Sequence, residues 1–379
     1  MNFGFTEEQE LLRAEVRKFL DRNCPLDEVR KVAETPEGFS RQLWGRMAEL
    51  GWVGLLLPEK HGGAGLGWVD LVVVLEEAGR SLLPSPLISS VLAGAAIALG
   101  GDSEQQSRWL PDLAAGTRIG TLAFQEGDGI DPAQTSLAGV TTDVGFRLTG
   151  EKLLVADASA ADLFVVAFRA SEASDALSLA VVPRDAPGLG VEPHISVDLT
   201  KPMGRVRFDA VEVSGADVLG PPGSGGELLQ RLIDCGATAV TAELVGAAEA
   251  ALALTVNYAK ERVQFDSPIG RFQSVKHPLA EMYVDIESTR SLCYYAAWLL
   301  DENPSEAALA VSRAKALASE RFPKLGIDVV QLHGGIGFTW EYDAHLYLKR
   351  AKWGRPAFGD ADWHFERIVR LAAAAASAV

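Results

Sequence analysis

A glycine-rich segment near the end of the chain has the composition of a ligand-binding turn. Residues Gln331–Phe338 read Gln-Leu-His-Gly-Gly-Ile-Gly-Phe, so that Gly334, Gly335 and Gly337 fill three of four consecutive positions. Glycine has no Cβ atom, and a ligand or a packed partner can therefore approach the bare backbone closely. The alternative is a glycine-rich helix end that serves only as a connector, with His333 capping the turn.

A second segment, residues 258–273, carries an arginine of the kind that binds phosphate groups, close to an aromatic residue. Arg262 stands where a long helical pattern ends, and Phe265 and Gln273 follow it. A guanidinium group can donate two parallel charge-assisted hydrogen bonds to a diphosphate, which an ammonium group cannot. The alternative is that Arg262 is a surface cation at a helix C-terminus, where the helix dipole favours positive charge.

The composition argues against several other classes of protein. The formal net charge is −16 and no run of Lys or Arg occurs, which argues against partners such as nucleic acid or an anionic membrane. No apolar run approaches the roughly 20 residues of a membrane span, and the acidic N-terminus does not resemble a signal peptide. Three widely spaced cysteines and six histidines show no metal-ligand spacing, so we expect no metal and a cytoplasmic protein with reduced thiols.

Residues 1–118 show the periodicity of helices. Thr6 to Gln9 form a capping box that opens an amphipathic helix. Ser103 to Gln106 form a second box, whose helix is expected to end near Pro111. Further helices are predicted at about 40–50, 68–83 and 86–99. This part of the chain is therefore predicted to be all-helical.

The pattern changes near Thr121 and changes again after a Gly- and Pro-rich linker at 220–226. Between these points, short runs predict strands at 140–155, 162–168, 177–182 and 206–213. Beyond the linker, long helices are predicted at about 227–262, 272–300 and 303–332, the third with Asn303 as its N-cap, followed by shorter ones at 341–350 and 362–375. We predict an α+β, mostly α fold with an N-terminal helical domain (1–118), a middle small β domain (119–222) and a C-terminal four-helix-bundle domain (223–379).

The two ligand-binding segments and this order of domains resemble the acyl-CoA dehydrogenase family over essentially the whole chain. The resemblance implies a flavoenzyme that desaturates an acyl-CoA thioester, assembled as a tetramer with FAD lying across a subunit boundary. One chain then holds the flavin ring, and its neighbour holds much of the ADP end. Asp266 stands where the family usually has Gly, which adds a negative charge nearby. The residues that match the family's ADP-end positions are Arg262, Phe265, Gln273, Gln331, Gly334 and Gly335.

The residues that the family places against the flavin ring are only partly present. Glu126 and Asp131 match the family pattern, but the hydroxyl residues and the proline beside them do not. After Gly150-Glu-Lys152, the aliphatic residues 153–155 stand where the family has an aromatic residue and a threonine. The resemblance therefore implies a β domain that serves as a scaffold and has few flavin contacts.

The catalytic carboxylate of the family has no counterpart at either of its two usual positions. Removal of the weakly acidic α-proton requires an oriented base with a raised pKa. Gly236, 26 residues before Arg262, occupies one position, and Gly359 occupies the other. The possible substitutes are Asp360 and Glu243, which lies about 10 Å further along the helix than Gly236 on nearly the same face. Otherwise Glu243 is a structural or interface residue.

A chain that keeps the ADP half and lacks the base resembles the non-catalytic subunit of actinobacterial α2β2 acyl-CoA dehydrogenases. This implies a second acyl-CoA dehydrogenase-type subunit as partner, a shared FAD, an acyl-CoA substrate with a bulky or steroid side-chain acyl group, and an electron-transfer flavoprotein as acceptor. Three alternatives stay open: a homotetrameric dehydrogenase with a displaced base, a flavin monooxygenase of the same fold, and a non-enzymatic structural subunit.

Overall fold

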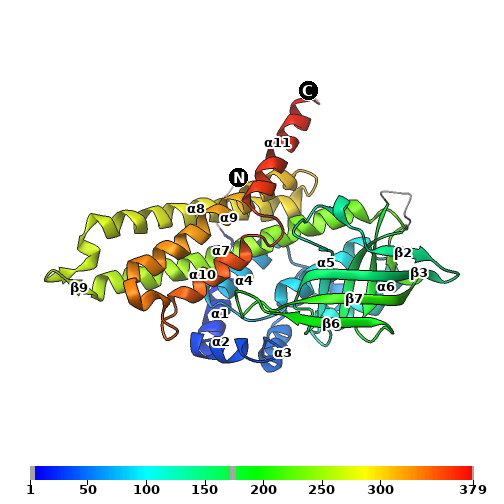
Figure 1. Ribbon diagram of the computed structural model, residues 1–379, viewed down its shortest axis with the longest axis horizontal. Coiled ribbons are helices and arrows are strands. Elements are labelled where there is room, and N and C mark those ends of the chain that lie inside the picture. The colour runs from blue at the N-terminus through cyan, green and yellow to red at the C-terminus, as the bar shows by residue number, and fades with distance from the viewer. Residues whose placement is uncertain (1–4, 171–175, 378–379) are drawn as a thin grey trace. The chain divides into compact units, whose positions relative to one another are not determined.

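The computed structural model describes residues 5–170 and 176–377 (Figure 1). The described chain is mostly helical, with one small sheet in the middle of the sequence, which confirms the predicted α+β, mostly α fold class. Its internal contacts divide it into two compact units. Unit 1 comprises Met1–Lys31, Trp68–Leu83 and Ala237–Val379, and unit 2 comprises Val32–Gly67 and Pro84–Gly236.

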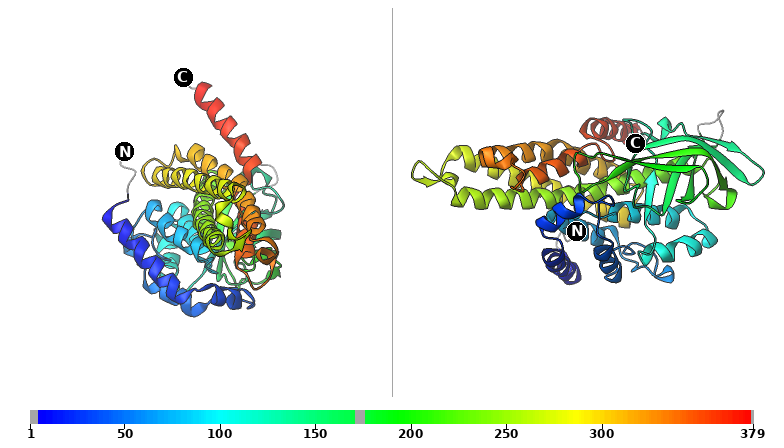
Figure 2. Two further views of the ribbon diagram at one scale, coloured as in Figure 1. Left: turned by 90° about the vertical axis from the view of Figure 1, so that its left-hand side faces the viewer. Right: turned by 60° about the horizontal axis from the view of Figure 1, so that its bottom comes forward.

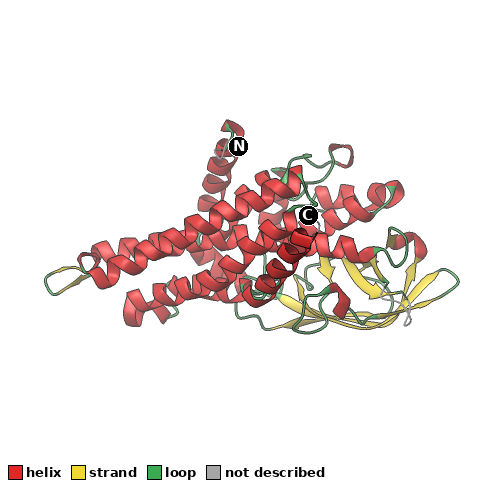
Figure 3. Ribbon diagram, turned by 90° about the horizontal axis from the view of Figure 1, so that it is seen from above, coloured by secondary structure: helices red, strands yellow, loops and turns green. Residues whose placement is uncertain are grey.

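Unit 1 is built on long helices that lie side by side (Figures 1 and 2). The two longest are joined at one end by a two-stranded hairpin, which Figure 3 shows as two short strands beyond the helices. The elements of unit 1 are α1 (Glu7–Asn23), most of α2 (Leu26–Ala33), α4 (Trp68–Arg80), α7 (Gly225–Glu261) from Ala237 onward, β9 (Val263–Gln264), β10 (Ser267–Pro268), η4 (Ile269–Arg271), α8 (Gln273–Glu302), α9 (Ala307–His333), η5 (Gly334–Phe338), α10 (Ala344–Gly354) and α11 (Ala361–Ser377).

Helices α4 and α7 cross at two glycines, so that their backbones are in direct contact. A Cβ atom at Gly79 would lie 1.8 Å from the carbonyl oxygen of Glu243, and one at Gly246 would lie 1.7 Å from that of Glu76. No side chain fits at these distances, and glycine is required at both positions despite its low helix propensity. The crossing fixes the part of α7 that carries Glu243.

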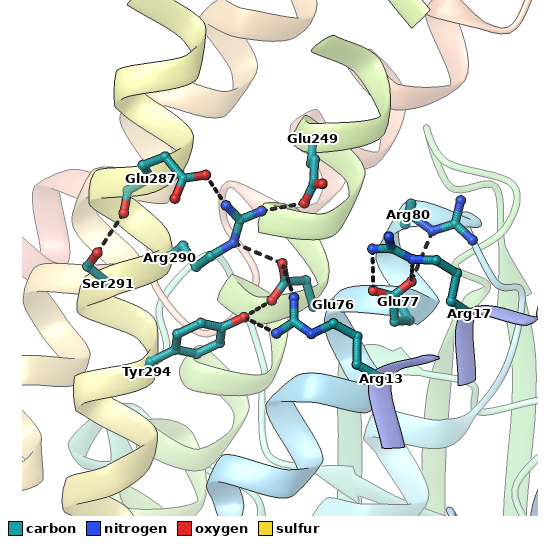
Figure 4. Close-up of polar contacts among 10 residues, drawn as sticks. All are labelled: Arg13, Arg17, Glu76, Glu77, Arg80, Glu249, Glu287, Arg290, Ser291 and Tyr294. Atoms are coloured by element: carbon teal, nitrogen blue, oxygen red, sulfur yellow. Dashed lines mark hydrogen bonds and ion pairs between the residues drawn. The ribbon is translucent and has the colours of Figure 1, made fainter. Parts of the chain in front are cut away.

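Two adjacent buried carboxylates on α4 connect the neighbouring helices through ion pairs (Figure 4). Glu76, which is 2% exposed, accepts a hydrogen bond from Nε of Arg290 on α8 at 2.9 Å and from the hydroxyl of Tyr294. Glu77, which is 1% exposed, accepts two hydrogen bonds from Arg17 on α1 at 2.8 and 2.7 Å. Since a buried charge requires a partner, these pairs hold α1 and α8 against α4.

Unit 2 contains the sheet and the helices that cover it. Its strands follow the order β6-β7-β3-β2-β4-β5-β8, with β1 pairing in parallel with β4. The core is formed by apolar side chains of these strands, including Phe164, Phe168 and Phe208. The elements are α3 (Arg41–Glu49), η1 (Glu59–His61), α5 (Leu87–Gly100), α6 (Ser103–Ala114), β1 (Gly120–Ala123), η2 (Pro132–Gln134), β2 (Ala138–Thr141), β3 (Gly145–Ala156), β4 (Leu163–Arg169), β5 (Leu177–Pro183), β6 (Leu189–His194), β7 (Met203–Ser214), η3 (Gly215–Asp217), β8 (Val218–Leu219) and the first residues of α7.

Several predicted helix ends differ from the observed ones. The capping box at Thr6 is confirmed, but the second box uses Asp102 as N-cap and Gln105, one residue earlier than predicted. Helix α6 continues through Pro111 to Ala114. Proline lacks the N–H donor, but the carbonyl of Pro111 still accepts a helical hydrogen bond from Ala115 at 3.0 Å. Asn303 ends α8 instead of opening α9, which begins at Ala307.

Helix α7 is long and apolar enough, by length and composition, to cross a membrane, and it is the one such helix found in the described part of the chain. The expectation that no apolar run approaches the length of a membrane span was therefore wrong for α7. In the structure 67% of the apolar window within α7 is buried inside the protein. This burial is what the core helix of a helical bundle requires.

Candidate functional site

The predicted diphosphate-binding segment forms a protruding hairpin after α7. Arg262 is exposed, its N–H donates to Tyr258 at 2.8 Å, and its carbonyl accepts from Ile269 at 2.8 Å. The turn between β9 and β10 consists of Phe265 and Asp266, whose φ angles are 54° and 59°. A two-residue hairpin turn of this kind needs positive φ at both positions. A glycine would suit position 266 for the same reason, and Asp is among the residues that tolerate it.

Phe265 is the most exposed aromatic side chain of this hairpin. It is 88% exposed, and its ring meets that of Phe272 edge-on, with centroids 6.0 Å apart. A bulky residue with positive φ is an uncommon, strained arrangement, and such strain gathers at functional sites. Gln273, the first residue of α8, is also exposed. The hairpin therefore presents a cation, an aromatic ring and an amide to the surroundings of unit 1.

The glycines of the glycine-rich segment, residues 331–338, have two different functions. Helix α9 ends at His333, and Gly334 follows with a φ of +63°. A Cβ atom at Gly334 or Gly335 would meet nothing within 4 Å in the described part of the chain, whereas one at Gly337 would lie 2.6 Å from the carbonyl oxygen of Val330. Gly337 is thus required by packing within the chain. Gly334 and Gly335 leave their backbone open to a ligand or a partner.

Tyr258 brings the two segments to the same end of unit 1. Its hydroxyl donates to the carbonyl oxygen of His333 at 3.3 Å, and the two rings lie 4.5 Å apart. Arg262 lies one helical turn beyond Tyr258, and Gln331 lies exposed near the end of α9. Six residues selected from the sequence thus lie on two neighbouring segments at one end of the bundle. A ligand that spans both segments would contact exposed backbone on one and a guanidinium on the other.

Sequence reasoning missed the residues that support the glycine turn. His333 was interpreted only as a turn cap, and Tyr342 and Arg30 were not selected. Arg30 on α2 donates to Asp343 at 2.8 Å and to the carbonyl oxygen of Tyr342 at 3.3 Å. The aromatic residues on both sides of the glycine turn could have been found from the sequence. The contact from Arg30 could not, because helix α2 itself was not predicted.

Glu243, considered as a substitute base, lies in a buried ion pair. Nη1 of Arg350 on α10 donates to Oε1 of Glu243 at 2.9 Å, and the two side chains are 0% and 3% exposed. Nη2 of Arg350 also donates to the carbonyl oxygen of Leu82 at 3.4 Å. A base needs a free oxygen directed at the proton it removes. The contacts of Glu243 fit its alternative interpretation as a structural residue better.

The other predicted base position lies in a tightly held turn. Gly359 is buried with a φ of +98°, and its carbonyl oxygen accepts from Nζ of Lys315 at 2.7 Å. Burial lowers the pKa of Lys315 to about 7, opposed by the nearby carboxylate of Asp360. Asp360 in turn accepts from the backbone N–H of Trp363 at 3.0 Å, at the start of α11. Gly236 lies buried within α7.

The segment that matches the family's flavin contacts is stabilised by a buried ion pair in unit 2. Lys152, which is 0% exposed, pairs with Glu126, and burial lowers the pKa of this lysine to about 8. Glu126 also accepts from the backbone of Ser136 at 2.8 Å. Asp131 accepts from Ala133 at 2.9 Å and caps η2. Glu126 and Asp131 border a cavity of about 230 Å³.

Comparison with known proteins identifies the family. The acyl-CoA dehydrogenase N-terminal domain matches residues 6–117, and the acyl-CoA dehydrogenase C-terminal domain matches residues 223–373. The acyl-CoA dehydrogenase IpdE2 of Mycolicibacterium smegmatis is 32% identical over 347 residues, which are 91% of this chain and 93% of that protein.

Two solved structures are similar over nearly their whole length. The ChsE4-ChsE5 complex from Mycobacterium tuberculosis has a TM-score of 0.91 and 30% identity, covering 98% of this chain and 99% of that chain. A variant of the Tcur3481-Tcur3483 steroid ACAD has a TM-score of 0.89 and 33% identity, with the same coverage. These likenesses define an oxidoreductase that acts on the CH–CH group of an acyl-CoA. The chain belongs to the acyl-CoA dehydrogenase family, and its cofactor is FAD.

Proposed function

We propose that this chain is the partner subunit of a heteromeric acyl-CoA dehydrogenase. In this proposal it holds the ADP end of an FAD whose flavin ring and catalytic base belong to a second family chain. The observation that carries the proposal is the contrast between two groups of residues. The ADP-end residues are exposed at one end of unit 1, whereas Glu243, the main substitute base, is buried against Arg350.

The exposed end of unit 1 fits the nucleotide end of FAD. Arg262 would bind the diphosphate by paired hydrogen bonds, and Phe265 would pack on the cofactor. The open backbone at Gly334 and Gly335 would allow the adenosine part to approach, since no side chain among the described residues fills that space. Gln273 and Gln331 would add polar contacts. When bound, FAD supplies the hydride acceptor for desaturation of the acyl chain.

The absence of a base in this chain is supported by its residue types and contacts. Positions 236 and 359 carry glycine, and Asp360 hydrogen-bonds to the first turn of α11. We therefore infer that the second chain provides the carboxylate that removes the α-proton. An α2β2 assembly with one FAD for every two chains follows from this division.

The similar proteins suggest the class of substrate. The Tcur3481-Tcur3483 protein is a steroid ACAD, and both similar structures are named as pairs of chains. We propose a bulky acyl-CoA, such as a steroid side-chain thioester, as substrate, and an electron-transfer flavoprotein as electron acceptor. The reduced, widely spaced cysteines fit a cytoplasmic location.

The test is the flavin content of the protein expressed alone and together with a catalytic acyl-CoA dehydrogenase chain encoded beside it. We expect a colourless chain alone and one FAD per two chains in the purified complex. Arg262→Ala should remove FAD from the complex, whereas Arg231→Ala, at an exposed arginine within α7, should not. One FAD per chain in the protein expressed alone, with acyl-CoA turnover, would show a homomeric dehydrogenase instead.

A further inference from the structure

His333 is enclosed by aromatic rings directly before the open glycines. It is 3% exposed and lies 4.5 Å from the ring of Tyr258 on α7 and 4.9 Å from the ring of Tyr342, which follows the turn. The three rings therefore join the end of α7, the end of α9 and the segment after η5. Gly334 is the residue that follows His333, so the packing of this ring holds the backbone at the start of the open turn.

The hydrogen bonds of His333 define the state of its ring. Nδ1 lies 2.8 Å from the carbonyl oxygen of Val329, and a carbonyl oxygen can only accept, so Nδ1 carries the proton. In the neutral ring Nε2 is then an acceptor. It is buried and has no hydrogen-bond partner within residues 5–170 and 176–377. Burial lowers the pKa of His333, which favours this neutral form.

A second anchor holds the far side of the turn. Arg30 donates to Asp343 and to the carbonyl oxygen of Tyr342, and its guanidinium lies 5.3 Å from the ring centre of Trp340. The glycine turn is thus fixed before Gly334 by His333 and after Phe338 by Arg30. A turn fixed at both ends loses little conformational entropy when a ligand binds to it.

We propose that His333 is a positioning residue that sets the Gly334–Gly335 backbone for the nucleotide end of FAD. The inference rests on the proposed function, because it assumes that this end of the chain binds the ADP part. His333 acts through the backbone that follows it, with its ring held by Tyr258 and Tyr342. The carbonyl of Val329 fixes the ring's orientation.

The test compares two substitutions in the FAD-loaded complex. His333→Phe keeps an aromatic ring and loses both nitrogens, and His333→Asn keeps a donor near the position of Nδ1 and loses the ring. We expect both to release FAD at least tenfold faster than the unmodified complex, measured as the rise in flavin fluorescence on dilution. The control, His194→Phe on β6, should release FAD at the unmodified rate.

A pH profile separates positioning from a merely structural function. The titratable and charged groups around the ring are Tyr258 and Glu261 from α7, Tyr342 and Asp343 from the segment after the turn, and Arg30 from α2. Because the pKa of His333 is lowered, the ring gains its second proton only below the ordinary histidine range, and Nε2–H then lacks an acceptor. FAD release should accelerate there in the unmodified complex and not in His333→Phe.

The outcomes distinguish the inference from the function on which it rests. Retention of FAD by Arg262→Ala would contradict the proposed nucleotide site itself. Loss of FAD from Arg262→Ala, combined with unchanged release from both His333 variants, would overturn only the positioning function. Reduced thermal stability of the His333 variants without faster release would also overturn it, since a structural residue gives that result.

Discussion

The buried pair of Glu243 and Arg350 offers a decisive test of whether this chain carries its own base. If Glu243 is structural, removal of either charge should destabilise the fold. If Glu243 is a base, its loss should abolish turnover and leave stability unchanged. The perturbations are Arg350→Met, Glu243→Leu and the double substitution, because Leu and Met fill similar volumes without a charge.

The expected magnitude follows from the geometry of the pair. Arg350 and Glu243 are 0% and 3% exposed and lie 2.9 Å apart, so either group alone would be a buried charge without its counter-ion. Removing one partner of such a pair costs about 3–5 kcal/mol, whereas replacing both with apolar side chains is close to neutral. A loss of this size changes the folding equilibrium more than a hundredfold, at about 1.4 kcal/mol per factor of ten.

The assay is urea unfolding of the coexpressed complex at fixed concentration, followed by tryptophan fluorescence, with Glu320→Gln on the exposed face of α9 as control. We expect each single substitution to lower the free energy of unfolding by several kcal/mol and the double substitution to restore most of it. Equal stability of all variants would refute the structural assignment. Turnover that is lost in Glu243→Gln while stability stays unchanged would identify Glu243 as the base.

Three further outcomes are expected from other contacts of unit 1. The pKa of Lys315 is lowered to about 7 in the folded protein. Between this pH and the ordinary pKa of lysine, the Lys315 side chain is therefore protonated in the unfolded state and neutral in the folded state. The free energy of unfolding should therefore rise with pH across that window by at most about 1.4 kcal/mol per unit relative to Lys315→Met, as measured by urea unfolding at each pH. Arg290→Met leaves Glu76 without its closest guanidinium and should cost about 3 kcal/mol, and a loss below 1 kcal/mol would show that Arg13 and Tyr294 suffice. Thr6→Ala removes an N-cap and should cost about 1 kcal/mol, seen as faster amide exchange in α1 and nowhere else.

The sequence predicted those features that depend on local composition. The capping box at Thr6 and the long helices from 227 onward follow from neighbouring residue types, and both are present. Helix α2 and strand β6 were missed. Strand β6 was missed because its residues show no alternation of buried and exposed side chains. The false N-cap at Asn303 shows the same limit, since a polar residue before proline can end one helix as readily as open another.

The candidate site was predictable only in part, because sequence shows residue types but not which groups already have partners. Arg262, Phe265 and the open glycines, selected from the sequence, lie on neighbouring segments, and their binding function stays a prediction. Glu243 was selected because a carboxylate lay at helical spacing from Gly236. Its partner, Arg350, is 107 residues away in sequence and could not be assigned without the fold.

The pairing of the buried carboxylates in unit 1 with arginines supports the proposal that a second chain provides the catalytic base. Within the described residues of this unit, the buried acids are Glu76, Glu77 and Glu243, and each lies against an arginine. In each case a guanidinium binds at least one carboxylate oxygen, and it stabilises the ionised form. The groups left open to solvent lie instead at the hairpin and the glycine turn. A chain whose buried acids are paired with arginines, and whose proposed diphosphate-binding residues are exposed, is suited to complete another chain's active site. The FAD stoichiometry of the complex decides whether this chain does so.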